Sequence, residues 1–203
     1  TADNVESLVR HVDVVVDGAD NFAARYLLSD ACVRHGKPLV YGAVHRFEGQ
    51  VSVFDAGRQR GQAPCYRCLF PEPPPPEFAP NCAEAGVLGV LPGVIGLLQA
   101  TEVIKLLLGV GETLAGRLLH FDALAMRFRE TRLAADPGCA VCAPGRPFPG
   151  YRELQVACGA DDDTARTADD DLARRILEGA DQIRTPQEGY QVAVTISSAV
   201  PGE

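Results

Sequence analysis

The feature that most constrains this chain is a pair of Cys-x-x-Cys motifs that lie far apart in the sequence. The first motif holds Cys65 and Cys68, the second holds Cys139 and Cys142, and residues 69–138 separate them. Two such tight turns can bring four thiolates to one metal ion. A set of four cysteine ligands is typical of structural zinc and leaves no ligand position open for chemistry. We therefore predict a zinc site that joins two distant segments.

Two other uses of these motifs are open at this point, a pair of disulfides or a redox-active thiol pair. A disulfide framework is typical of small secreted chains, whereas this chain has an odd number of cysteines, 7, and no signal-like N-terminus. A thioredoxin-like motif would be a single pair at the start of a helix. Both alternatives therefore fit less well than structural zinc.

Composition argues against several classes of protein. With 203 residues, 46% of them hydrophobic, the chain can bury one sizeable core, and its net charge of -8 argues against nucleic acid as a partner. The longest apolar run, residues 87–98, contains Gly and Pro and is too short for a membrane span. We expect a cytoplasmic protein that binds no membrane and meets a reducing environment.

Local patterns in the first third of the chain predict an α/β fold. Residues 11–17 have the β-branched run of a buried parallel strand, and residues 39–44 have the pattern of the next strand. Between them we expect a helix that Asp20 or Asn21 caps and that ends at Gly36. This order is a βαβ unit, which places two parallel strands in one sheet.

The next hundred residues predict antiparallel strands and one long helix. Residues 51–53 alternate as in an exposed antiparallel strand, and residues 118–121 and 126–133 have the pattern of two more strands. Residues 94–108 are almost wholly apolar, so we expect a helix that is buried on most sides. The predicted sheet is therefore mixed, parallel at its start and antiparallel at its end.

The two ends of the chain differ in charge. Residues 151–203 carry eleven acidic and five basic side chains, which accounts for most of the net charge. We therefore predict one domain over residues 1–149 and an acidic linker or poorly structured tail over residues 150–203.

Six short motifs follow one another along residues 1–143 and together resemble the ThiF/MoeB family, the bacterial relatives of the ubiquitin-activating enzymes. The resemblance implies that this chain holds the C-terminal portion of a Rossmann-like mixed sheet. The motifs are Asp17-Gly-Ala-Asp20-Asn21-Phe-Ala-Ala-Arg25, Glu48-Gly-Gln50, Cys65-Tyr-Arg-Cys68, Asn81-Cys82-Ala-Glu-Ala-Gly86, Gly93-Val-Ile-Gly96-Leu-Leu-Gln-Ala-Thr-Glu102-Val-Ile-Lys105 and Pro137-Gly-Cys139-Ala-Val-Cys142.

The resemblance also implies a reaction, adenylylation by Mg-ATP of the C-terminal glycine of a ubiquitin-like sulfur carrier protein. Such carriers, of the ThiS or MoaD type, end in Gly-Gly. Pyrophosphate leaves, and a sulfur donor such as a cysteine desulfurase or rhodanese then converts the acyl-adenylate to a thiocarboxylate for thiamin or molybdopterin synthesis. Family members act as homodimers, so we expect one here.

Two residues carry the chemistry that the resemblance implies. From the sequence alone, Asp20 either caps a helix or binds a cation at the end of a strand; the resemblance implies that it holds Mg²⁺ against the triphosphate. Cys82 follows a proline-rich loop, where relatives carry a thiol that attacks the acyl-adenylate or exchanges sulfur with the carrier. The alternative for Cys82 is a cysteine that does no obligatory chemistry.

The family's nucleotide-binding half, with its Gly-x-Gly-x-x-Gly turn, would precede Thr1. We therefore expect this chain to be a fragment that lacks most of the ATP pocket. Alone, it should bind zinc but neither bind ATP tightly nor release pyrophosphate. The alternative is a catalytically inactive, zinc-containing module that binds the carrier.

Overall fold

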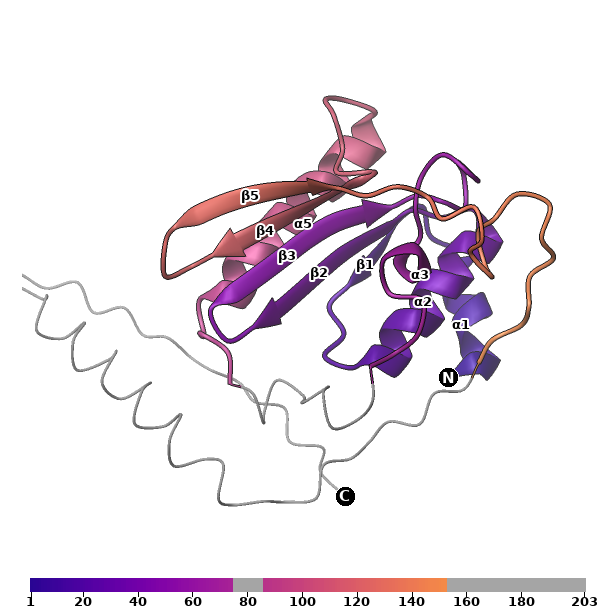
Figure 1. Ribbon diagram of the computed structural model, residues 1–203, viewed down its shortest axis with the longest axis horizontal. Coiled ribbons are helices and arrows are strands. Elements are labelled where there is room, and N and C mark those ends of the chain that lie inside the picture. Colours follow the sequence, from indigo (N-terminus) through magenta and orange to yellow (C-terminus); the bar gives the residue numbers. More distant parts are fainter. Residues whose placement is uncertain (75–85, 153–203) are drawn as a thin grey trace, which may run out of the picture. The chain divides into compact units, whose positions relative to one another are not determined.

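The structure is a computed structural model that describes residues 1–74 and 86–152. Its strands form one five-stranded sheet in the order β1-β2-β3-β4-β5 (Figure 1). The pair β1 and β2 is parallel, and every later pair is antiparallel, so the predicted mixed α/β sheet is confirmed. The strands are β1 (Val15–Asp17), β2 (Leu39–His45), β3 (Glu48–Phe54), β4 (Arg117–Asp122) and β5 (Arg127–Arg132).

The predicted βαβ unit is present, with helix α2 (Phe22–His35) between the two parallel strands. Asn21 is the cap, because its side chain accepts a hydrogen bond of 2.9 Å from the Ala24 amide. Gly36 ends the helix in the left-handed conformation that glycine adopts most readily. Asp20 is therefore not the helix cap and lies one residue before it.

Helix α1 (Ala2–Val9) was not predicted. It packs on α2, and its Val5 and Val9 are buried in the same hydrophobic core as Leu39 of β2. The two valines lie four residues apart, on one side of a helix, and the Asn4 side chain accepts a hydrogen bond from the chain's first nitrogen. The signal was thus present but only two turns long.

Helix α5 (Leu91–Leu108) crosses the other face of the sheet, over β2 and β3 (Figure 1). It is long and apolar enough to cross a membrane, a property that core helices of soluble proteins share. Its buried side is narrow, with Leu91, Ile95, Gln99 and Glu102. The expectation that this helix is buried on most sides is wrong for the described chain.

One strand also differs from its prediction. Residues 51–53 were expected in an exposed strand, but Val51 and Val53 in β3 are fully buried. The reason is that α5 covers one face of β3, while α1 and α2 share a core with the other face through Phe54. Alternation therefore identified the strand correctly but not its burial.

Gly42 in β2 offers a test of how α5 sits on the sheet. A Cβ atom at Gly42 would overlap the side-chain amide of Gln99, which donates hydrogen bonds to the Asp17 and Val40 carbonyl oxygens. We expect Gly42→Ala to lower the free energy of unfolding by about 1–3 kcal/mol. Urea unfolding monitored by circular dichroism measures this change.

Gly96→Ala is the matched control. Gly96 lies on the exposed side of α5, and a Cβ atom there meets open space. This substitution should leave stability unchanged or raise it by up to about 1 kcal/mol, because alanine favours helix more than glycine does. Equal stability of Gly42→Ala and the wild type would show that the contact between β2 and α5 is looser than described.

Candidate functional site: a four-cysteine cluster beside an acidic pocket

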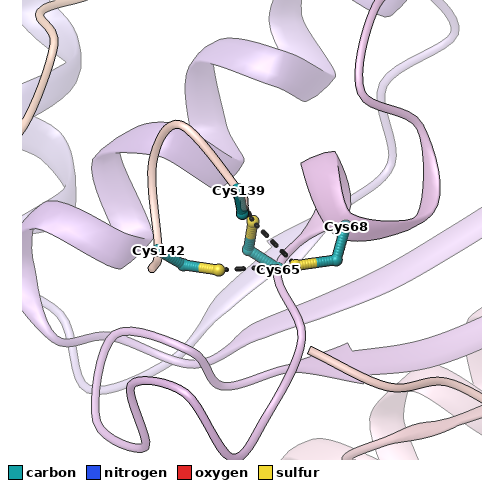
Figure 2. A group of neighbouring side chains, drawn as sticks. All are labelled: Cys65, Cys68, Cys139 and Cys142. Atoms are coloured by element: carbon teal, nitrogen blue, oxygen red, sulfur yellow. Dashed lines mark hydrogen bonds between the residues drawn. The ribbon is translucent and has the colours of Figure 1, made fainter. Parts of the chain in front are cut away.

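The fold brings the four cysteines of the two motifs together, as predicted (Figure 2). Cys65 is the N-cap of the short helix α3 (Tyr66–Leu69), which follows β3, and Cys68 lies within that helix. Cys139 and Cys142 lie in the loop after β5. Three sulfur–sulfur distances are 3.8 Å for Cys65–Cys68, 3.6 Å for Cys65–Cys139 and 3.4 Å for Cys68–Cys142. All four sulfur atoms lie within 4.8 Å of one another.

These distances fit a tetrahedral metal site and not a disulfide. Four sulfurs bound to zinc at about 2.3 Å lie about 3.8 Å apart, whereas a disulfide joins two sulfurs at about 2.05 Å. Cys68 also accepts a hydrogen bond of 3.3 Å from the Asp136 amide, which stabilises negative charge on its sulfur. The cluster can therefore hold a metal ion as four thiolates, with no position left open for a substrate.

A second site lies where β1 and β2 end side by side. Because these strands are parallel, their carboxyl ends share one edge of the sheet, where α/β proteins gather ligands. A pocket of about 550 Å³ opens there, and Asp20, Arg25, Tyr41 and Tyr66 are among the residues that line it. The structure thus places Asp20 in a cavity large enough for a small molecule.

The loop that carries Asp20 is held by a buried ion pair. Asp17 is fully buried; its carboxylate accepts hydrogen bonds from the Ala19 amide, at 2.8 Å, and from Arg25 Nε, at 2.9 Å. Arg25 Nη2 in turn donates to the carbonyl oxygens of Ala19, at 2.6 Å, and Gly42, at 3.3 Å. Both polar groups of the Ala19 backbone are therefore fixed by side chains.

The charge on each partner of this pair favours the ionised form of the other. Burial raises the pKa of Asp17, while the charge of Arg25 and the Ala19 amide act in the opposite direction. Burial also opposes the charge on Arg25, but the Asp17 carboxylate raises the pKa of that guanidinium above its ordinary value. Since arginine is not deprotonated in proteins, its charge persists and keeps the Asp17 carboxylate ionised beside it.

Asp20 itself is exposed, and its carboxylate accepts one hydrogen bond, of 3.2 Å, from the Asn21 side chain. Among residues 1–74 and 86–152, no ion pair involves Asp20. The loop thus presents to the pocket a carboxylate that no cation of the described residues neutralises. Oxygen ligands of this kind suit Mg²⁺, so the pocket can accept a hard cation next to a bound anion.

Aromatic and amide side chains complete the pocket. The Tyr41 hydroxyl donates to Gln50 Oε1 at 3.2 Å, and the Arg25 guanidinium lies 5.0 Å from the centre of the Tyr41 ring. Gln99 reaches the pocket from α5 and ties that helix to the end of β1. The wall of the cavity therefore combines aromatic rings with amide and charged groups.

Sequence reasoning missed part of this arrangement. Arg25 stood in one of the six motifs without a role of its own, yet it is buried and lines the pocket, and neither Tyr66 nor Gln99 stood out as a pocket residue. The sequence feature that could have identified Arg25 is its spacing of eight residues from Asp17. This spacing places Arg25 in the first turn of α2, next to the end of β1. Cys82 lies outside the described residues, so its role stays a prediction.

The profile of the ThiF family matches residues 1–141. Among curated proteins, the sulfur carrier protein adenylyltransferase of Thermus thermophilus is 51% identical over 78% of this chain and 59% of its own length. The SAMP-activating enzyme E1 of Haloferax volcanii is 52% identical over 70% of this chain and 51% of its own length. The adenylyltransferase and sulfurtransferase MOCS3 of Anopheles gambiae is 46% identical over 95% of this chain and 42% of its own length.

Solved structures agree with the fold. The crystal structure of MccB from E. coli superimposes with a TM-score of 0.57 at 16% identity, over 75% of this chain and 45% of MccB. This likeness concerns the fold alone. The chain spans about half the length of the curated relatives it matches. From the profile match and the level of identity, the chain belongs to the ThiF family.

Proposed function

We propose that this chain takes part in ATP-dependent adenylylation of the C-terminal glycine of a ubiquitin-like sulfur carrier protein. The names of its relatives support the reaction class, since they include a sulfur carrier protein adenylyltransferase and a SAMP-activating enzyme. The observation that carries the proposal is the exposed Asp20 carboxylate on a loop that the buried Asp17–Arg25 pair holds, beside a pocket at the ends of parallel strands. This geometry suits a charged phosphate ligand with its cation.

Each residue of the site has a part in the proposed reaction. Asp20 would hold Mg²⁺, which neutralises charge on the triphosphate as pyrophosphate leaves. Arg25 and Asp17 would keep the Asp20 loop fixed, so that little reorganisation is needed when the nucleotide binds. The rings of Tyr41 and Tyr66 would limit water near the acyl-adenylate, which water would otherwise hydrolyse.

The later sulfur step is proposed from the sequence. Cys82, when ionised, would attack the acyl carbon and displace AMP, which leaves the carrier joined to the enzyme before sulfur arrives from a cysteine desulfurase or rhodanese. The alternative, that Cys82 does no obligatory chemistry and the donor attacks the adenylate directly, remains open. Thiamin, molybdopterin and other thiocarboxylate pathways would all be served by the same first step.

We propose zinc as the metal at the four cysteines, because an all-thiolate tetrahedral set is typical of structural Zn²⁺. Cysteines that are not joined in disulfides are typical of a reducing compartment, which supports a cytoplasmic location. The zinc would fix the loop after β5 to the segment after β3 and would take no part in adenylylation.

We further propose that the protein is a homodimer that buries the outer side of α5. Leu97, Ile104, Leu107 and Leu108 are 72%, 56%, 58% and 68% exposed, which is a long apolar stripe for one helix. Their spacing of three, four and seven residues places them on neighbouring turns of one side of the helix. A second copy of the same stripe would cover this surface by two-fold symmetry.

The metal proposal predicts a specific loss. Cys139→Ser should reduce bound zinc from about one ion per chain to a weakly held fraction. It should also lower the free energy of unfolding by several kcal/mol, because metal binding is coupled to folding of the two Cys-x-x-Cys turns, which we call the first knuckle (residues 65–68) and the second knuckle (residues 139–142). Elemental analysis and urea unfolding test this. Cys32→Ala is the control: Cys32 is buried in α2, where burial raises its thiol pKa to about 12, and it lies outside the cluster. Zinc retained in full by Cys139→Ser would contradict the site.

The Asp20 role is tested in the complete gene product by carrier-dependent exchange between ATP and pyrophosphate. Asp20→Asn keeps the size of the side chain but removes its charge, so exchange should fall by about 100-fold or more while carrier binding persists. Asp13→Asn, an exposed aspartate before β1, should have no effect. Normal exchange by Asp20→Asn would refute the assignment, and carrier binding by a wild type without exchange would favour the inactive binding module.

The dimer is tested by sedimentation velocity of the purified protein. The double substitution Leu97→Glu and Ile104→Glu places two charges on the α5 stripe and should convert the dimer to a monomer. Leu124→Glu, at a side chain that is 70% exposed in the turn between β4 and β5, should stay dimeric. A wild type that is monomeric at micromolar concentration would exclude this interface.

A further inference from the structure

The two residues between Cys65 and Cys68 reach into two different cavities. Tyr66 lines the pocket that contains Asp20. Arg67 lines a separate cavity of about 220 Å³, together with Cys139 of the second motif. The first cysteine pair thus contacts the Asp20 pocket through Tyr66, and it contacts the cavity beside the second cysteine pair through Arg67.

Arg67 fastens the first knuckle to α2. Its Nε and Nη2 atoms donate to the two carboxylate oxygens of Asp30, each at 2.8 Å, and both residues are buried. The Arg67 guanidinium also lies 4.6 Å from the centre of the Tyr26 ring. A bidentate, buried pair of this kind fixes orientation as well as distance, and lysine could not reproduce it.

Tyr66 connects the same knuckle to the pocket wall. Its ring centre lies 5.0 Å from that of Tyr26, 5.6 Å from that of Tyr41 and 5.1 Å from that of Phe70. Its amide donates to the buried Ser29 hydroxyl of α2 at 3.3 Å. Tyr66 is 1% exposed, so its ring has little freedom to move unless the backbone between the two cysteines moves.

The contacts continue from Tyr66 to the Asp20 loop. Tyr41 packs against Tyr66 on one side and against the Arg25 guanidinium on the other. Arg25 binds Asp17 and the Ala19 carbonyl oxygen, which fix the loop. The steps from Tyr66 to Asp17 are contacts between buried groups, in which a shift of one group displaces the next, and the last step, to Ala19, is partly buried.

We infer that Tyr66 and Arg67 are positioning residues, through which the metal-held knuckle fixes the wall of the Asp20 pocket. Arg67 holds the knuckle on α2, and Tyr66 transmits its position to Tyr41 and Arg25. The inference rests on the metal at the four cysteines but not on the adenylylation reaction. A failed exchange assay and a failed test of this coupling are therefore separate results.

Hydrogen exchange measured by mass spectrometry tests the coupling without any activity assay. With Zn²⁺ in excess, Tyr66→Ala should keep its metal and raise exchange in residues 17–25 on the order of tenfold, because the loop loses its support. Tyr66→Phe keeps the ring and should show a much smaller rise than Tyr66→Ala, because the ring contacts remain. Phe148→Ala removes a ring that also packs on the cysteine cluster, away from the pocket, and should leave residues 17–25 unchanged.

The wild type supplies a second measurement that does not depend on any variant. Removal of metal with a chelator should raise exchange in residues 17–25 while the β4–β5 strands over residues 117–132 stay protected. Unchanged exchange in residues 17–25 would overturn the inference. An equal rise in both segments would also overturn it, since it would mean general unfolding. This comparison decides the matter if Tyr66→Ala fails to retain the metal.

Arg67 has its own readout, the rate at which zinc passes to a colorimetric chelator. Arg67→Lys keeps the charge but loses the bidentate hydrogen bonds to Asp30, so zinc release should be faster by about tenfold. Arg60→Lys, an exposed arginine before the first motif, is the control and should release zinc at the wild-type rate. Equal rates for Arg67→Lys and the wild type would remove Arg67 from the proposed route.

Discussion

Four cysteine sulfurs within 4.8 Å of one another are the contact that joins the loop after β5 to the segment after β3. The loop that carries Cys139 and Cys142 has no helix or strand of its own, and it returns from the free end of β5 to the region of α2. Four thiols without a metal would offer only weak hydrogen bonds there. A bound metal replaces these with four strong bonds, and structural zinc sites in peptides contribute about 10–16 kcal/mol to folding. With a metal bound, the segment after β5 would be held by sulfur ligands in addition to the burial of Val141 and the packing of Phe148.

Helix α2 connects this metal cluster to the ligand pocket through two buried ion pairs. Near its start, Arg25 pairs with Asp17 at the end of β1, and near its middle, Asp30 pairs with Arg67 between the first two cysteines. Removing one partner of a buried pair costs about 3–5 kcal/mol, because the other charge is left uncompensated. Both pairs therefore make the position of α2 specific, whatever their net contribution to stability. One helix thus supports both the loop that presents Asp20 and the turn that carries Cys65 and Cys68.

Much of the fold could be predicted from the sequence because its signals are local. Gly36 and Gly109 mark helix ends, the β-branched run before Asp17 marks a buried strand, and the spacing of the cysteines identified the whole metal set. The burial of Arg25, the exposure of Leu97 and the place of Tyr66 in the pocket could not be predicted in this way. Each depends on which distant surface packs against the residue, and a charged or apolar side chain alone does not specify that.

The most direct test of this account is X-ray absorption at the zinc edge of the purified protein. If the two knuckles close on one structural ion, the spectrum will show four sulfur neighbours at about 2.3 Å and no nitrogen or oxygen ligand. A first shell with fewer sulfurs and with water or imidazole in their place would contradict the account. In that case the clamp between the two halves of the chain, and the support it gives to the Asp20 pocket, would have to come from some other interaction.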